Sequence, residues 1–195
     1  GIRDSVASRG LGDVYKRQGG NIKSPIGDPR ETILAAIKKL SVNSLNMLKI
    51  SNFYLTPAIP LGSGPTFINV VAKVQSNLNA NELLNQFHLI ETAFNRQRSK
   101  RWGSRTLDID LLALEDQVFP SKAEFLKWFK LSKKDQTKYT PQNLILPHPR
   151  IQDRAFVLLP FKEIDENWIH PVLKKSITVM LSELDPSEYK DFKKL

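Results

Sequence analysis

The sequence contains no cysteine, which excludes disulfide bonds and thiolate metal sites and suits a reducing compartment. No apolar run approaches the ~18 residues that a membrane-spanning helix needs, and the N-terminus lacks an apolar signal-peptide core. There is also no G-x-x-x-x-G-K-[ST] motif, which argues against a P-loop mechanism. We find no internal repeat and no interdomain linker. These absences predict a cytoplasmic protein with one domain and no membrane partner.

Composition and charge narrow the class of partner. Of 195 residues, 41% are hydrophobic and 25% are charged, which is ordinary for a globular domain large enough to bury a core. The formal net charge of +9 indicates an anionic partner, which could be a nucleotide, a nucleic acid or a membrane surface. Charge alone does not choose among the three.

The first eighteen residues, "GIRDSVASRGLGDVYKRQ", show neither helical nor strand periodicity. They look like translated read-through of a sequencing adapter, and the alternative is a disordered tail. We therefore expect residues 1–18 to be a non-native or disordered segment and residues 19–195 to form the domain.

The remaining chain alternates helical and strand patterns. "GDPRETILAAIKKL" places Asp28 as a helix cap, Pro29 in the first turn and Glu31 at the capping-box position. Further along, apolar periodicity predicts strands over 47–55, 67–75 and 105–114, and helices over 79–95 and 122–131.

This order indicates an α+β fold, a ferredoxin-like βαββαβ sandwich with extra C-terminal helices. The opening strand should end near "GGN" (19–21), where the aperiodic segment stands instead, so we expect that strand to be missing or replaced. After a polar connector over 132–143, the pattern predicts a short strand, a turn and a helix broken near Pro160.

The stretch "RWGSRTLDIDLL" carries the chemistry. Along a strand Asp108 and Asp110 share one face, while Leu107, Ile109 and Leu111 share the other. The two carboxylates can converge on one small volume, where Mg²⁺ is the natural cation, as one ion or as two. Alone, a D-x-D pair is more often a solvated edge or a capping pair.

Basic residues precede the acids directly. "NRQRSKRWGSR" supplies Arg96, Arg98, Lys100, Arg101 and Arg105 without an intervening acid. Arginine forks bind phosphate oxygens in a bidentate manner, and bases beside metal-binding acids are typical of a polyphosphate site. The alternative for the basic run is an exposed loop.

At this motif the chain resembles the hydroxymethyldihydropterin pyrophosphokinases of folate synthesis, which carry R-W-G-x-R-T-L-D-[IL]-D on a ferredoxin-like fold. "GGN", "SNFYLTPA", "GPTFIN" and "LPHPRIQDRAFVLLPFKEI" resemble further motifs of the family, in the same order. The resemblance covers the chain from Gly19 to about Pro171.

The resemblance implies transfer of pyrophosphate from ATP to the hydroxymethyl group of a reduced pterin, with release of AMP. It implies that Asp108 and Asp110 hold two Mg²⁺ ions. The catalytic group that it implies also includes Arg96, Arg98 and Arg105. The ATP-binding residues that it implies are these three arginines together with Glu91, Trp102, His148 and Arg154. Two of these have plainer alternatives, a backbone-bonded turn histidine for His148 and a solvent-facing charge for Glu91.

For the pterin, the resemblance implies two stacking rings and a few fixed polar groups. The residues that it implies are Thr56, Pro57, Ile59, Phe67, Asn69 and Phe156. For each phenylalanine the alternative is an ordinary core position.

Two other functions are left open by the residues. A ferredoxin-like sheet in a basic chain could bind RNA, but "TLDIDLL" puts acids on the face that RNA phosphates would approach. The chain could also be an inactive, truncated family member that kept the pocket. We expect ATP and the reduced pterin as partners, no nucleic acid, and a monomer.

Overall fold

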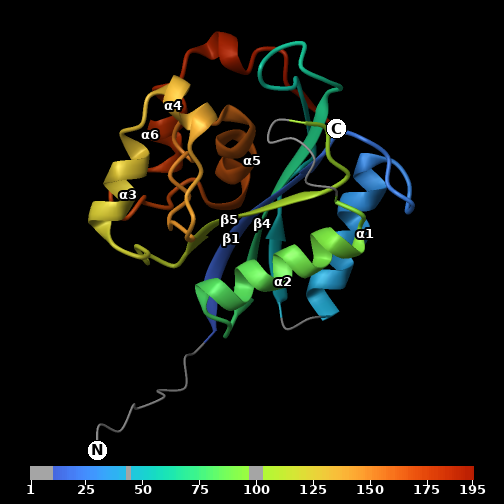
Figure 1. Ribbon diagram of the computed structural model, residues 1–195, viewed down its shortest axis with the longest axis horizontal. Coiled ribbons are helices and arrows are strands. Elements are labelled where there is room, and N and C mark those ends of the chain that lie inside the picture. Colours follow the sequence, from blue (N-terminus) through green and yellow to red (C-terminus); the bar gives the residue numbers. More distant parts are fainter. Residues whose placement is uncertain (1–10, 43–44, 97–102) are drawn as a thin grey trace, which may run out of the picture.

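The computed structural model of the protein describes residues 11–42, 45–96 and 103–195. Strands and helices alternate through the first part of the chain, and helices predominate after it (Figure 1). The strands are β1 (Gly12–Gly20), β2 (Asn46–Ile50), β3 (Tyr54–Thr56), β4 (Phe67–Ser76), β5 (Asp108–Leu114) and β6 (Lys193–Lys194). The helices are α1 (Pro29–Val42), α2 (Ala80–Ala93), α3 (Lys122–Phe129), α4 (Lys133–Lys138), α5 (Ala155–Asp165) and α6 (Ile177–Ser182), with a short 3-10 helix at Pro186–Glu188.

All strands join one antiparallel sheet in the order β5-β1-β4-β3-β6, and β2 also pairs with β4. Strand β1 is therefore an inner strand with neighbours on both sides. Helices α1 and α2 cover one face of the sheet, and α5 and α6 cover the other (Figure 1). The protein is thus an α+β fold with three layers.

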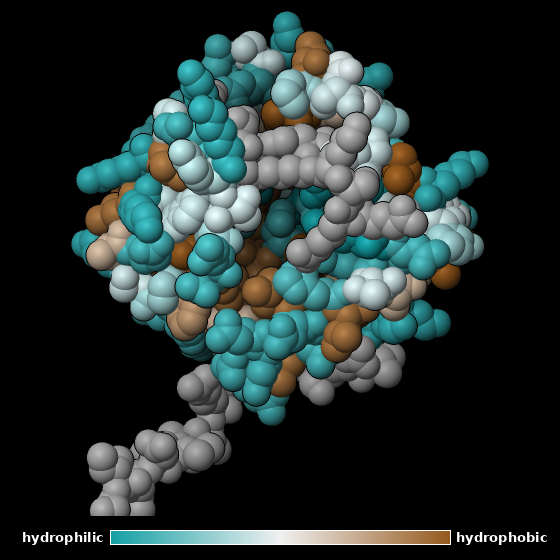
Figure 2. Space-filling view, in the orientation of Figure 1, coloured by the Kyte–Doolittle hydropathy of each residue, from teal (hydrophilic) through white to brown (hydrophobic). Residues whose placement is uncertain are grey.

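Each face of the sheet has its own apolar core, because side chains alternate along the strands. In β4, Val70 and Val74 pack under α1 and α2, while Val71 packs under α5. The space-filling view in Figure 2 shows a hollow near the middle of one side of the molecule, with both hydrophilic and hydrophobic residues on its rim. In the part of the chain that the structure describes, no helix is long and apolar enough to cross a membrane.

Side-chain caps fix the starts of the two helices that pack beside each other. The Asp28 carboxylate accepts from the Glu31 N–H at 2.9 Å, and the Glu31 carboxylate accepts from the Asp28 N–H at 2.8 Å. Asn79 and Glu82 form the same reciprocal pair before α2. The capping box predicted for α1 is therefore confirmed, since both orphan N–H groups find acceptors.

The expectation that the opening strand is missing was wrong, whereas its replacement by a non-native segment stays a prediction. Residues 12–18, which the sequence placed in a disordered or non-native segment, form most of β1 and pair with β4 and β5 along the strand. Backbone hydrogen bonds supply this pairing and do not depend on a hydrophobic pattern. The prediction for residues 1–10 lies outside the described residues.

Three smaller predictions also need correction. The strand expected over 47–55 is divided into β2 and β3. The polar connector contains α4, whose N-cap Ser132 accepts from the Asp135 N–H. Helix α5 continues through Pro160, because the lost hydrogen bond is outweighed by its buried apolar face, which includes Val157 and Phe161.

The backbone of β1 pairs with strands on both sides in the sheet, but two of its side chains place polar groups in the apolar core. By alternation, Lys16 and Gln18 lie on the same face as Val14, under α1 and α2. Lys16 is completely buried, and its Nζ donates to Gln18 Oε1 at 2.9 Å. Burial lowers the pKa of Lys16 from 10.5 to about 7, because the side chain loses its hydration and no carboxylate of the described residues compensates that loss.

We predict that Lys16→Met stabilises the protein at pH 7 by a few kcal/mol, because each unit of pKa depression corresponds to about 1.4 kcal/mol. Between pH 7 and 10.5 the folded chain binds fewer protons at Lys16 than the unfolded chain. The stability of the parent protein therefore rises with pH in this window, and the advantage of the variant shrinks. Urea unfolding at several pH values from 7 to 10 measures both the stability gained by the variant and the change of that gain with pH.

The matched control is Lys38→Met, on the exposed surface of α1, which should change stability by no more than about 0.5 kcal/mol. If Lys16→Met gave no more stability than this control, the conclusion that Lys16 is buried at a cost in stability would be wrong.

Candidate active site

The two acids of β5 converge on one point. Ile109 between them packs into the core under α1 and α2, so Asp108 and Asp110 lie on the opposite face of the sheet. The Oδ2 atoms of both carboxylates accept from a single nitrogen, Arg17 Nη1, at 2.7 Å and 3.1 Å. Asp108 is buried and Asp110 is half-buried. The predicted convergence of the two carboxylates is therefore confirmed.

Arg17 of β1 lies at the point of convergence. Its Nε and Nη2 donate to Asn69 Oδ1 at 2.9 Å and 2.6 Å, so all three nitrogens of the buried guanidinium have acceptors. Arg17 was not among the predicted site residues, because residues 1–18 show no periodicity and were expected to lie outside the domain. Its position two residues before Gly19, where the resemblance puts the end of the opening strand, was the sequence signal that could have located it.

Three further arginines surround the carboxylates. Arg96 Nη2 lies 2.6 Å from Asp108 Oδ1, and Arg105 Nη1 lies 3.0 Å from Asp108 Oδ2. Arg154, at the start of α5, reaches Asp110 Oδ2 at 3.8 Å. Burial alone would raise the pKa of Asp108, but the guanidiniums of Arg17, Arg105 and Arg96 hold it below its usual range.

Glu91 connects α2 to this cluster. Its Oε1 accepts from the Ile109 N–H of β5 at 2.7 Å and forms an ion pair with Arg96. Only 2% of the residue is exposed, so the solvent-facing alternative for Glu91 was wrong. Burial raises the pKa of Glu91, while the Arg96 guanidinium opposes that rise. Glu91 thus holds Arg96 beside Asp108.

His148 packs between backbone and Arg154. Its Nδ1 accepts from the Arg150 N–H at 3.1 Å, and Arg154 Nη1 lies 3.5 Å from its Nε2. Burial lowers the pKa of His148 well below its ordinary value, and the charges of Arg154 and Arg150 add to this effect. The imidazole is therefore neutral at pH 7. The backbone-bonded turn histidine considered for this position matches these contacts.

The polar residues predicted for the pterin lie beside the acids. Asn69 Nδ2 donates to Thr56 Oγ1 at 2.8 Å, and Asn69 pairs across the sheet with Gly19. The half-buried Phe156 ring lies 5.3 Å from the Arg17 guanidinium and 5.6 Å from that of Arg154. Asn69 is thus part of the same cluster.

The other predicted pterin residues lie around Thr56 and Asn69. Phe67 is half-buried and, two residues before Asn69 in β4, shares its face of the sheet. Pro57 follows β3 directly and is half-buried, whereas Ile59 is 55% exposed.

Asn21 ties the end of β1 to the loop before β5. Its Oδ1 accepts from the Arg105 N–H at 2.8 Å, and its Nδ2 donates to the Pro65 carbonyl at 3.1 Å. The preceding Gly20 permits this approach, because a Cβ there would lie 2.4 Å from the Thr106 carbonyl oxygen. The sequence showed "GGN" only as a strand end and did not predict a role for Asn21.

Comparison with known proteins identifies the family. The model of the 7,8-dihydro-6-hydroxymethylpterin-pyrophosphokinase (HPPK) family matches residues 18–166. The chain belongs to the HPPK family. It is 31% identical over 167 residues to the pyrophosphokinase of Aquifex aeolicus, with 86% of this chain and 89% of that protein covered. It is 30% identical over 168 residues to that of Synechocystis, with 86% and 73% covered.

Solved structures share the HPPK fold. The chain matches the HPPK-DHPS protein of Plasmodium falciparum with a TM-score of 0.66 at 14% identity, covering 97% of this chain and 45% of that one. A likeness at this identity shows the fold alone. The chain also spans only 18% of the folic acid synthesis protein of Pneumocystis carinii, to which it is 31% identical. Several relatives are thus much longer than the HPPK part they share.

Family membership confirms the enzyme class predicted from the sequence. HPPK enzymes transfer pyrophosphate from ATP to hydroxymethyldihydropterin in folate biosynthesis, and this chain belongs to their family. Of the residues that the resemblance implied, Arg98 and Trp102 lie outside the described residues. The structure brings Glu91, Arg96, Arg105 and Arg154 to the two aspartates. The family match begins one residue after Arg17.

A divalent cation fits the donors of the site but not its space. Two converging carboxylates are oxygen ligands of the kind that Mg²⁺ prefers. However, Arg17 Nη1 fills their common point, and a cation cannot share it. Within the described ranges, no cluster of three or more His, Asp or Glu side chains could hold a metal. As arranged here, the residues do not admit the predicted ions.

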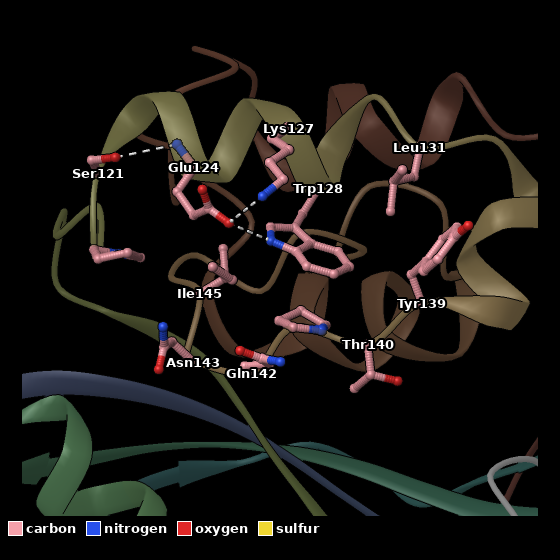
Figure 3. Close-up of a pocket in the computed structure, with 12 residues that line it drawn as sticks. Ser121, Glu124, Lys127, Trp128, Leu131, Tyr139, Thr140, Gln142, Asn143 and Ile145 are labelled. Atoms are coloured by element: carbon pink, nitrogen blue, oxygen red, sulfur yellow. Dashed lines mark hydrogen bonds and ion pairs between the residues drawn. The ribbon is translucent and has the colours of Figure 1, made fainter.

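A separate cavity of about 720 Å³ lies in the 121–143 region, for which the sequence suggested no role. Figure 3 shows the Trp128 ring at its centre, with the Trp128 Nε1–H donating to Glu124 at 2.8 Å and Lys127 on the same carboxylate. None of its lining residues belongs to the cluster around Asp108 and Asp110.

We predict that Asp108→Asn destabilises the protein by about 3 kcal/mol, because it removes the carboxylate shared by the buried guanidinium of Arg17 and the half-buried guanidiniums of Arg96 and Arg105. Asp110→Asn should cost less than about 1 kcal/mol, because Asp110 is more exposed and its contacts are longer. Since the pKa of Asp108 is lowered, its contribution is complete above about pH 4 and is lost as the pH falls below that.

Urea unfolding of both variants at pH 7 and at lower pH tests this order. Equal losses for the two variants would contradict the assignment of Asp108 as the buried centre of the ion-pair cluster.

Proposed function

We propose that the HPPK reaction of this chain takes place at the cluster around Asp108 and Asp110. The observation that carries the proposal is the meeting of two carboxylates with arginines from separate segments, next to Asn69. Such a cluster combines groups for a polyphosphate with polar groups for a flat heterocycle. The order β1-α1-β2-β4-α2-β5 supports the ferredoxin-like class predicted from the sequence.

On the ATP side, Arg96, Arg105 and Arg154 exchange part of their contacts with aspartate for contacts with phosphate oxygens. Each guanidinium has several N–H donors in a planar fork, so it can hold a carboxylate and a phosphate at once. Glu91 positions Arg96 by fixing it to β5. The neutral His148 takes part by hydrogen bonding rather than by charge. Arg98 and Trp102 remain predicted ATP contacts.

On the pterin side, the Asn69 amide and the Thr56 hydroxyl supply fixed polar groups. The pair is held at 2.8 Å across β3 and β4, which limits its freedom before substrate binds. Phe67 and Phe156 supply the faces for stacking, and the backbone at Pro57 and Ile59 supplies further donors and acceptors. These roles rest on the family's motifs and on the placement of the residues around one strand pair.

The chemistry needs positioning and charge compensation more than covalent help. The pterin hydroxyl oxygen attacks the β-phosphorus of ATP, the bond to the oxygen bridging to the α-phosphorus breaks, and AMP leaves with that electron pair. The hydroxyl proton passes to solvent. The arginines compensate the charge that develops on the phosphate oxygens. The monomeric state and the cytoplasmic location predicted from the sequence stay predictions. So do the two Mg²⁺ ions, whose binding would require Arg17 to leave the point between the carboxylates.

The alternative of an inactive family member is favoured by one observation. Arg17 occupies the centre between the carboxylates and also binds Asn69, so it competes with groups of both substrates. Measurement of AMP release by the parent chain distinguishes an active enzyme from an inactive family member. The RNA-binding alternative gains no support from the family assignment.

We predict that Asp110→Ala lowers AMP release by 100-fold or more, on the order of the loss from removing one charged group of a transfer site. The fold should survive, because Asp110 is half-buried with contacts of 3.1 Å and 3.8 Å. The measurement is chromatographic quantification of AMP from ATP, with and without 6-hydroxymethyl-7,8-dihydropterin.

The matched control is Glu124→Ala, which removes a half-buried acid of α3 outside the cluster and should leave turnover unchanged. Near-normal turnover in Asp110→Ala would count against the proposed site. An absence of pterin-dependent AMP from the parent chain would favour the inactive alternative.

A further inference from the structure

Arg17 occupies the position that a cation would take between Asp108 and Asp110. A single nitrogen, Nη1, contacts an oxygen of each carboxylate at 2.7 Å and 3.1 Å. These distances exceed a Mg²⁺–oxygen bond by about 0.6 to 1 Å. Small shifts of two carboxylates would therefore close them on a metal ion if the guanidinium were absent. The ion and the guanidinium exclude each other.

The arginine is held in this place by contacts on three sides. Asn69 Oδ1 accepts from Nε and Nη2, and the Phe156 ring lies 5.3 Å from the guanidinium carbon. The side chain is only 5% exposed. A buried guanidinium with its donors satisfied on two carboxylates and an amide does not leave readily, because departure would strand its charge and theirs.

The other arginines do not block the same point. Arg96 contacts the opposite oxygen of Asp108, Oδ1, and Arg154 approaches Asp110 only to 3.8 Å. Arg105 shares Asp108 Oδ2 but makes no contact with Asp110 among those the structure describes. Only Arg17 bridges the pair in the described chain. Its removal would therefore open the bridging position while the carboxylates keep their other partners.

We propose that Arg17 is an internal cation that occupies the divalent-metal position between Asp108 and Asp110 and keeps metal ions out. The inference rests on the proposed function, because it assigns the same two carboxylates. It makes Arg17 an autoinhibitory contact built into β1. Metal binding by the parent chain is then weak until this side chain is removed.

The test is direct binding of Mn²⁺, a spectroscopic substitute for Mg²⁺, to the full chain without ATP or pterin. Electron paramagnetic resonance measures free Mn²⁺ in titrations of the parent chain and of Arg17→Ala. We expect Arg17→Ala to bind Mn²⁺ at least 10-fold more tightly. Arg17→Lys, which keeps a cation at the position, should bind as weakly as the parent.

Arg30→Ala controls for the change in net charge, since Arg30 is exposed on α1 and packs on Phe53. It should bind Mn²⁺ as the parent does. Equal affinity of the parent and Arg17→Ala would overturn the proposal, as would equal tightening in Arg17→Lys or Arg30→Ala.

A second readout keeps the proposal testable if Arg17→Ala folds poorly. Ligands that bind only the folded state raise its melting temperature. Millimolar MnCl₂ should therefore raise the melting temperature of Arg17→Ala by several degrees and leave that of the parent unchanged. An equal shift in both proteins would contradict the proposal.

Failure of the inference and failure of the proposed function give different results. If Arg17→Ala gains Mn²⁺ affinity but neither protein releases pterin-dependent AMP, the inference stands and the proposed function fails. If the parent releases AMP while Arg17→Ala shows no gain in Mn²⁺ affinity, the proposed function stands and the inference fails.

Discussion

The structure depends on the compensation of two like charges placed side by side on β5, the edge strand next to β1. At a separation of about 4 Å and the effective dielectric of a protein, two carboxylates repel by about 4 kcal/mol before their desolvation is counted. This repulsion between Asp108 and Asp110 is compensated by guanidiniums from β1, the end of α2, the loop before β5 and the start of α5. Four separate segments must therefore arrive at one place for the fold to be stable. The same requirement assembles the site, so stability and function rest on one set of contacts.

Sequence patterns predicted those parts of the molecule whose side chains follow the local geometry. Alternation in β5 located the acids on one face and Ile109 on the other, and the capping box located the start of α1. Motif resemblance located Glu91, Asn69 and Arg154 without any account of their contacts. Spacing could not show that Glu91 bonds to the backbone of β5, because that contact joins residues distant in sequence. The continuity of α5 through Pro160 could not be predicted from the sequence, because the apolar packing that stabilises the helix is a tertiary effect.

Strand β1 was missed for a different physical reason. A strand is recognised in a sequence by alternating apolar residues, and β1 has polar side chains at three successive buried positions, 16–18. What forms the strand is backbone pairing with β4 and β5, which any non-proline residue can supply. Apolar alternation and backbone pairing between strands are usually found together, because natural sequences satisfy both. In β1 they are separated.

This separation bears on the proposal that residues 1–18 are a non-native segment. In natural sequences, local propensity, apolar pattern and core packing usually favour the same structure. Exceptions are found mainly at functional sites. Arg17 faces the site, so a function could account for it. Lys16 and Gln18 face the core under α1 and α2. Among the described residues, Lys16 has only an amide oxygen as partner and the Gln18 Nε2 is buried without one. No role at the site compensates that cost. The core-facing side of β1 therefore supports the proposal more strongly than the arginine in the site, and it does so independently of any catalytic argument.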